Sequence, residues 1–180
     1  MLSTALILGG CSRATVREVF PRMMVGRSGY VLSTPTCTAP ASLPGTTVRV
    51  TLSDHGMSRM MGGVAPMGAR MRLRPAPTRV AAGPVSFVAV NRGWRDHELV
   101  VLRLAAGSGV GQRDPGAKGR VAERGTLGEA SASCGAGTGD GIASGTTGWT
   151  TVTLAPGRYE LVCNLRNHYA NGMRALLVVT

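Results

Sequence analysis

Apolar and polar residues alternate along several short stretches of the chain, and a period of two residues is the pattern of half-buried β-strands. The stretches that predict strands are Gly45–Ser53, Val85–Asn91, His97–Leu104, Trp149–Leu154, Tyr159–Cys163 and Arg174–Thr180, of which Gly45–Ser53, Trp149–Leu154 and Tyr159–Cys163 alternate. Between the first two, Met71–Pro75 and Thr78–Pro84 are expected to form strand and turn. The 26 glycines and 10 prolines supply many turns. Short strands joined by frequent turns predict an all-β fold.

A glycine-rich segment, residues 105–148, interrupts this alternation. It holds 13 of the 26 glycines and shows little sustained periodicity. A glycine-rich loop of this length inside a compact domain is usually functional or mobile. Within it, Glu123–Cys134 is expected to form a short helix. The roles that we consider for the segment are shielding of a site, contact with a partner, or the placing of Cys134.

The composition is that of one globular domain. Hydrophobic residues make up 43% of the 180 residues and charged residues 16%, which argues against a disordered chain. Basic residues outnumber acidic ones 20 to 9, so the formal net charge is +11 and the electrostatic field favours acidic partners. The sequence contains no arginine-rich run with interleaved aromatic residues, so nucleic acid is not expected as a partner. A monomer is the default expectation.

A cysteine, two histidines and a methionine carry the candidate chemistry. Cys163, His168 and Met173 stand within eleven residues, at the end of an alternating stretch. His97, at the start of an upstream strand, supplies a second imidazole. Two His, one Cys and a long axial Met are the ligand set of blue copper sites, in which the metal cycles between Cu(I) and Cu(II). Zinc is the weaker interpretation, because the paired CxxC or HxxxH spacings usual in structural zinc sites are missing from the sequence.

The sequence around these residues resembles the cupredoxin family. The motifs that carry the resemblance are Asn91-x-Gly93-x3-His97-Glu98-Leu99 and Pro156-Gly157-x-Tyr159-x3-Cys163-x4-His168-x4-Met173. Within the family, the Cys-x4-His-x4-Met spacing and the Cys-Asn-x3-His-Tyr-x2-Gly-Met motif resemble the sulfocyanin and rusticyanin branch. The resemblance covers residues 45–180. Asn167 stands where many relatives have Gly, and Asn tolerates a left-handed backbone better than most residues.

The resemblance implies a cupredoxin-type Greek-key β-sandwich, with the glycine-rich segment as a long loop and the N-terminal part as an irregular extension. It implies one copper ion per chain, bound by His97, Cys163, His168 and Met173. Such a protein shuttles single electrons between redox partner proteins and is not an enzyme. With a net charge of +11, the expected partners are acidic at the contact face.

The resemblance and the sequence positions also predict what surrounds the metal ligands. His168 is expected near the surface, where its exposed edge provides the route for the electron. Asn91 is expected to cross-link the two segments that carry the ligands. The backbone amides of Glu98 and Leu165 are expected to donate hydrogen bonds to the sulfur of Cys163.

Two other functions remain open. A protein for copper delivery or storage could hold extra Cu(I) through the soft thioethers of a methionine-rich segment, residues 57–71. That segment follows His55 and contains Met57, Met60, Met61, Met67 and Met71. Methionine also fills irregular gaps in β-cores, which is the more ordinary interpretation. A cupredoxin-like domain that has lost its metal is the third possibility, and the intact ligand set argues against it.

The N-terminal segment Met1–Cys11 is short and apolar and ends in small residues and a cysteine. Its last four residues, Leu8-Gly-Gly-Cys11, resemble the bacterial lipobox, after which a signal is removed and the cysteine is lipidated. Because no Lys or Arg precedes the apolar run, a start further upstream or an ordinary buried strand is the alternative. The lipobox interpretation predicts a signal segment over 1–11, a linker over 12–44 and the cupredoxin domain over 45–180. It places the protein in the cell envelope, anchored by lipid to the outer face of the cytoplasmic membrane.

Two cysteines remain once Cys11 is assigned to lipid and Cys163 to metal. In an oxidising compartment, Cys37 and Cys134 are a candidate disulfide that ties the start of the domain to the long loop. In the cytoplasm both are expected to be free thiols.

Overall fold

The computed structural model describes residues 37–54 and 70–180, and every regular element within them is a strand. In chain order the strands are β1 (Thr46–Ser53), β2 (Arg72–Ala76), β3 (Arg79–Val80), β4 (Gly83–Asn91), β5 (Leu99–Arg103), β6 (Thr126–Ala130), β7 (Thr147–Leu154), β8 (Gly157–Val162) and β9 (Arg174–Val179). The prediction of an all-β fold is confirmed. The alternating stretches of the sequence correspond to the longer strands.

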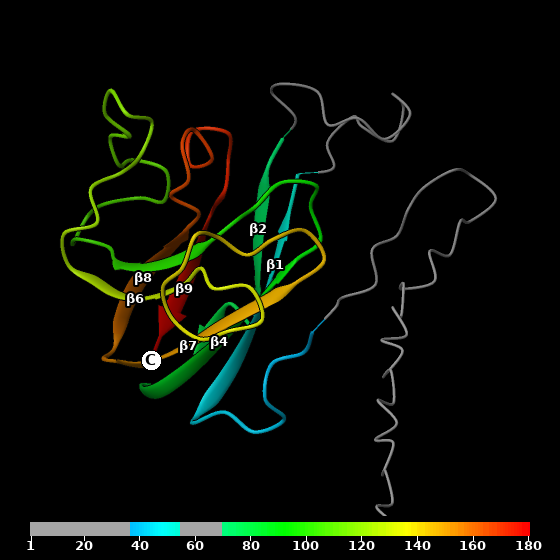
Figure 1. Cartoon of the computed structure of the whole chain (residues 1–180). Helices are drawn as coiled ribbons and strands as arrows, with labels where there is room; N and C mark the ends of the chain where they lie inside the picture. The colour runs from blue at the N-terminus through cyan, green and yellow to red at the C-terminus, as the bar shows by residue number, and fades with distance from the viewer. Residues whose placement is uncertain (1–36, 55–69) are drawn as a thin grey trace, which may run out of the picture.

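The strands form two sheets, and the chain crosses between them repeatedly (Figure 1). One sheet has the order β2-β1-β4-β7 and the other has the order β3-β9-β8-β5-β6. β1 runs parallel to β4 and β3 runs parallel to β9, whereas the other neighbours are antiparallel. After β4 the chain leaves for the β5–β6 pair, returns as β7, and leaves again for β8 and β9. These crossings make a Greek-key sandwich, as the resemblance to the cupredoxin family implied.

The main core lies between the two sheets. Burial alternates along β1, so Val48, Val50 and Leu52 are fully buried while the residues between them are not. Phe87 of β4 and Leu161 of β8 belong to the same buried cluster. Because burying a side chain of this size is worth about 1.5–3 kcal/mol, packing between the sheets is the main source of stability.

A smaller cluster shows what the glycine-rich segment covers. Val100 and Leu102 of β5 and Val162 of β8 pack with Val121 of that segment and Tyr169 of the β8–β9 loop. Their neighbours along the strands belong to the main core. Both faces of β5 are therefore buried, which explains why Leu99–Leu102 is an apolar run without alternation. In β8 the residues Tyr159–Val162 are all buried, and they include the charged Glu160.

The short helix expected over Glu123–Cys134 is wrong. That stretch contains β6, which pairs antiparallel with β5 and places Leu99 opposite Ala130. A side chain on Gly128 would collide with Val152 of β7, so the glycine permits close packing there. Glycine also disfavours a helix, and pairing with the edge of β5 outweighs the helix propensity of this short run.

The disulfide is confirmed, since Cys37 and Cys134 are bonded with a Cα–Cα distance of 5.6 Å. The bond closes a loop of 97 residues in sequence and ties the start of the described domain to the glycine-rich segment. Among the described residues, Cys163 is the free cysteine and it is buried.

Several predictions fall outside the described residues, namely the signal segment with Cys11, the linker up to residue 36, His55, and the methionines from Met57 to Met67. The last methionine of that run, Met71, is described. It is 3% exposed and belongs to the main core, which is the ordinary packing role for this residue. The described part of the chain contains no helix of the length and hydropathy that a membrane crossing needs.

Candidate metal centre

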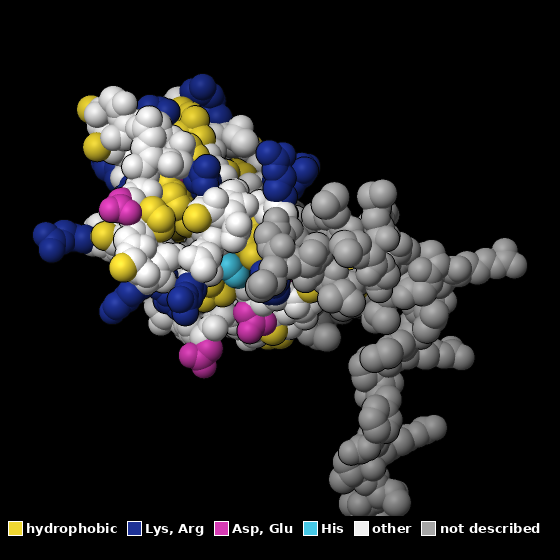
Figure 2. Space-filling model, turned by 90° about the horizontal axis from the view of Figure 1, so that it is seen from above, with side chains coloured by type: hydrophobic (Ala, Val, Ile, Leu, Met, Phe, Trp, Pro, Cys, Tyr) yellow, Lys and Arg dark blue, Asp and Glu magenta, His cyan; other side chains and the backbone are white. Residues whose placement is uncertain are grey.

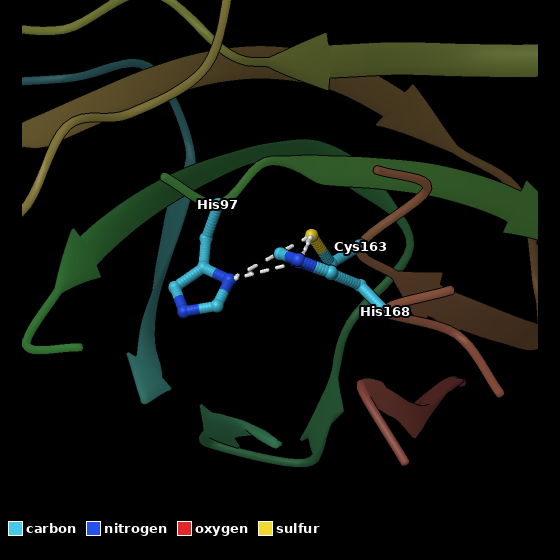
Figure 3. A group of neighbouring side chains, drawn as sticks. All are labelled: His97, Cys163 and His168. Atoms are coloured by element: carbon cyan, nitrogen blue, oxygen red, sulfur yellow. Dashed lines mark hydrogen bonds between the residues drawn. The ribbon is translucent and has the colours of Figure 1, made fainter. Parts of the chain in front are cut away.

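Three of the four predicted ligands meet at one end of the sandwich. His97 lies between β4 and β5, Cys163 directly follows β8, and His168 lies in the loop that joins β8 to β9. Figure 3 shows the two imidazole rings and the thiol turned toward one another. Their ligand atoms lie within 4.8 Å of each other, and all three residues are buried.

The distances among these atoms fit one bound metal ion. Nδ1 of His97 is 3.2 Å from Nδ1 of His168, and Sγ of Cys163 is 3.3 Å from His168 Nδ1 and 3.9 Å from His97 Nδ1. With metal–nitrogen bonds of about 2.0 Å and metal–sulfur bonds of about 2.3 Å, two donors at tetrahedral to trigonal angles stand about 3.3–3.8 Å apart. The observed values of 3.2–3.9 Å span this range. The thiol and imidazoles therefore surround a space of the size that a first-row ion requires.

Met173, the fourth predicted ligand, is tied to the same group through its backbone. Its carbonyl accepts the N–H of Cys163 at 3.0 Å and its own N–H donates to the carbonyl of His168 at 3.1 Å. The side chain is fully buried. These two backbone hydrogen bonds close the loop from Cys163 to Met173. The set of two His, one Cys and one Met is the donor chemistry of type 1 copper.

The sulfur of Cys163 is buried, and two backbone N–H groups donate hydrogen bonds to it. The N–H of Glu98 donates to Sγ at 3.3 Å, and a backbone hydrogen bond from Leu165 also stabilises the thiolate. Both predicted amide donors are therefore confirmed. Burial nevertheless raises the pKa of the Cys163 thiol to about 12. The thiol keeps its proton at neutral pH, so a metal must displace it, and affinity will rise with pH.

His168 provides the edge of the site that is nearest to solvent. It is 8% exposed, whereas His97 is 0% exposed. Figure 2, which looks down on this end of the molecule, shows imidazole surface (cyan) with apolar, basic and acidic side chains nearby. Burial lowers the pKa of His168, and the charges of Arg95 and Arg120 lower it further. The ring is thus held neutral, the form that binds a metal.

Asn91 does not make the cross-link that the resemblance implied. Its side-chain amide donates to the carbonyls of Arg95 and Ile142, each at 2.7 Å, and its oxygen accepts the N–H of Gly93 at 2.8 Å. These bonds fix the loop that carries His97 and join it to the glycine-rich segment. Asn91 makes no hydrogen bond to the described β8–β9 loop, so the prediction that it joins the two ligand-bearing segments is wrong.

Glu98 joins the two ligand-bearing segments instead. Its N–H donates to Cys163 Sγ, and its carboxylate accepts the N–H of Asn164 at 2.9 Å. Burial raises the pKa of Glu98 to about 7, and the charges of Glu129 and Glu123 add to the rise. The sequence pointed to the backbone of Glu98 but not to this second contact of its side chain.

The glycine-rich segment also holds the β8–β9 loop. The side chain of Asn164 accepts the N–H of Val121 at 2.7 Å and donates to its carbonyl at 2.9 Å. The N–H of Asn167 donates to the carbonyl of Gly119 at 2.7 Å. Asn167 has a φ of 66°, the left-handed conformation expected of it. These contacts were not predicted, because nothing in the local sequence indicates which distant backbone a buried Asn will bind.

Comparison with known proteins gives a likeness in structure only. No family model matches the chain, and no curated protein does. A reduced auracyanin from Roseiflexus castenholzii is 14% identical, with a TM-score of 0.46 over 76% of this chain and 98% of that one. Auracyanin A, a "blue" copper protein from Chloroflexus aurantiacus, is 16% identical, with a TM-score of 0.43 over 74% of this chain and 99% of its own. A reduced rusticyanin is 18% identical, with a TM-score of 0.44 over 83% of this chain and 91% of its own. At such low similarity the function has to be argued from the site itself.

Proposed function

We propose that the protein is a mononuclear copper protein that carries single electrons, with the metal held by His97, Cys163, His168 and Met173. The observation that carries the proposal is the convergence of one thiol and two Nδ1 atoms at 3.2–3.9 Å in a buried space. Copper bound there would accept and release one electron by cycling between Cu(II) and Cu(I).

The chain's own residues supply rigidity and exclude water. His97, Cys163 and Met173 are all 0% exposed, so their donor atoms lie in packed protein. Donors fixed in this way suit both oxidation states, since neither requires the ligands to rearrange. The same burial leaves no access for a substrate at three of the four donors. This supports an electron carrier and not an enzyme.

His168 is the proposed route for the electron, because it has the only exposed surface among the described ligands. Arg95 and Arg120 lie close enough for their charges to act on its ring. The face around His168 is therefore suited to redox proteins that are acidic at the contact, and we propose such partners for a monomeric carrier. Oxidation by an anionic metal complex should slow as salt rises, and Arg120→Gln should weaken that salt dependence. A rate that is independent of salt in both proteins would contradict the proposed partner chemistry.

Export to the cell envelope is the location that we propose. The bond between Cys37 and Cys134 supports it, since disulfides persist in oxidising compartments. Attachment by a lipid at Cys11 is a further proposal that rests on the sequence motif. Fractionation of cells that express the full chain tests both: wild type should sediment with membranes and Cys11→Ser should be released. Wild-type protein in the cytosol would contradict export, and a Cys11→Ser variant that still sediments with membranes would contradict the lipid anchor.

Copper titration followed by visible and EPR spectroscopy tests the function. Wild type should bind one Cu(II) per chain with an intense blue thiolate-to-copper band. Cys163→Ser should lose the band, whereas Cys11→Ser is a matched control that should keep it. A colourless protein that binds only Cu(I), with or without Cys163, would contradict the electron carrier and favour copper delivery or storage.

A further inference from the structure

A buried carboxylate lies behind His97, on the side away from the other ligands. Asp54 directly follows β1 and is 0% exposed. A carboxylate without partners is costly to bury. Two backbone N–H groups meet this cost in part, because Trp94 donates to Oδ1 at 2.7 Å and Arg95 donates to Oδ2 at 3.2 Å. Asp54 is thus held by the same loop that carries His97.

The carboxylate faces the ring nitrogen that does not point to the metal space. Oδ2 of Asp54 is 3.9 Å from Nε2 of His97, and both side chains are buried. On the other side of the ring, Nδ1 faces Cys163 and His168 (Figure 3). The two nitrogens of one imidazole are therefore placed in different surroundings, one beside a negative charge and one among the ligand atoms.

Gly93 permits this arrangement. A Cβ at this position would lie 2.5 Å from Oδ1 of Asp54 and 2.8 Å from Nε2 of His97. Any other residue would push the carboxylate and the ring apart. The glycine of the sequence motif is thus explained by the approach of two side chains, and not by a positive φ, since none is found at Gly93.

We propose that Asp54 is a positioning residue that sets the tautomer of His97 and lowers the reduction potential of the site. The proposal rests on the proposed copper site. A neutral imidazole carries one proton, and a carboxylate beside Nε2 attracts the proton to that nitrogen. Nδ1 is then left with the lone pair that a metal needs, which is the usual relation between a metal-bound His and a carboxylate behind it. The buried negative charge also favours Cu(II) over Cu(I), because it offsets the larger positive charge.

The test compares Asp54→Asn with Asp96→Asn in the full chain. Asn retains an oxygen for the N–H of Trp94 but removes the charge. Asp96 is the matched control, since it stands next to His97 in sequence and is exposed. In Asp54→Asn, affinity for Cu(II) should fall about 10- to 100-fold and the reduction potential should rise. In Asp96→Asn both should stay near wild type. Equal potentials in the two variants would overturn the proposal.

A measurement on the wild-type chain keeps the proposal testable if Asp54→Asn fails to fold. Nitrogen-15 NMR of the metal-free protein should show the His97 proton on Nε2, and a proton on Nδ1 would overturn the proposal. The failures are distinguishable. If the wild-type protein shows no blue band, the copper site itself is rejected. If wild type is blue but Asp54→Asn has the same reduction potential, only the role of this carboxylate is rejected.

Discussion

The metal ligands come from two segments, the loop that carries His97 (the His97 arm) and the β8–β9 loop from Cys163 to Met173 (the Cys163 arm). The two arms are held in different ways. At the ligand itself the His97 arm is held by backbone pairing, with the N–H of Ile142 donating to the carbonyl of His97 at 2.6 Å and the N–H of His97 donating back at 3.1 Å. The side chain of Asn91 adds a bond to the carbonyl of Ile142. The arm from Cys163 to Met173 is a loop whose outer contacts are largely made by side chains, above all Asn164 on Val121. Backbone pairing at His97 depends little on residue identity, whereas the contact of the β8–β9 loop with Val121 depends on one particular side chain.

Both arms nevertheless rest on the glycine-rich segment. Its later part, which contains Ile142 and the disulfide at Cys134, supports His97. Its earlier part, which contains Gly119 and Val121, supports the β8–β9 loop. In Figure 1 this segment runs beside the orange-red β8–β9 loop and also across the middle of the molecule. The segment is therefore a support for the site, and its glycines allow close backbone approach.

Copper loading should have the largest effect, because the ion would join the two arms. With free copper at about 1,000 times the dissociation constant, a ligand that binds only the folded state adds about 4.1 kcal/mol to the free energy of unfolding. Chemical denaturation with and without copper measures this. Hydrogen exchange should slow in both arms of wild type and in neither arm of Cys163→Ser. Slowing in one arm alone would contradict a shared metal.

Removal of the disulfide should come next. The double variant Cys37→Ser, Cys134→Ser should lose about 2–4 kcal/mol, because its unfolded chain is no longer restrained by the long loop. Urea denaturation measures the loss. Faster amide exchange is expected at Ile142 and His97, and much less change at Cys163. If exchange rises equally in both arms, the two supports are not separate.

Loss of the Asn164 side chain should affect the β8–β9 loop that carries Cys163 and His168. Asn164→Ala leaves the N–H and the carbonyl of Val121 without their buried partner, which costs about 1–3 kcal/mol. Amide exchange should rise around Cys163 and His168 and stay unchanged at His97. Asn171→Ala is the matched control, since the Asn171 side chain donates to Asn167 in an exposed position. A control as damaging as Asn164→Ala would refute the specific role of the Val121 contact.

Substitutions at Asn167 should have the smallest effect on stability. Its φ of 66° is unfavourable for residues with a Cβ, so Asn167→Ala should cost roughly 1 kcal/mol. Asn167→Gly should be close to neutral, because glycine adopts this conformation readily. Thermal denaturation of the two variants checks the order. An alanine variant as stable as the glycine variant would show that the left-handed conformation imposes no constraint.

The sequence predicted the parts of the structure that depend on local pattern. The strands follow from alternation, and His97, Cys163 and His168 were found from residue chemistry and spacing, which the structure then brings together. Glu123–Cys134 was expected to be helical on local propensity alone. Local propensity does not reveal that the edge of β5 is available for strand pairing. Asn91 was given the wrong partner, and Asp54 was not singled out. Both depend on contacts across more than 30 positions of sequence, Asn91 with Ile142 and Asp54 with Trp94, which periodicity does not reveal.

X-ray absorption at the copper edge, in oxidised and reduced full-length protein, tests the central claim most directly. The account predicts two nitrogen donors and one short sulfur donor in both oxidation states, with bond lengths that change little between them. Cys163→Ser should remove the short sulfur. Loss of a nitrogen or of the sulfur on reduction, or a shell made only of long thioether sulfurs, would contradict a rigid electron-transfer site.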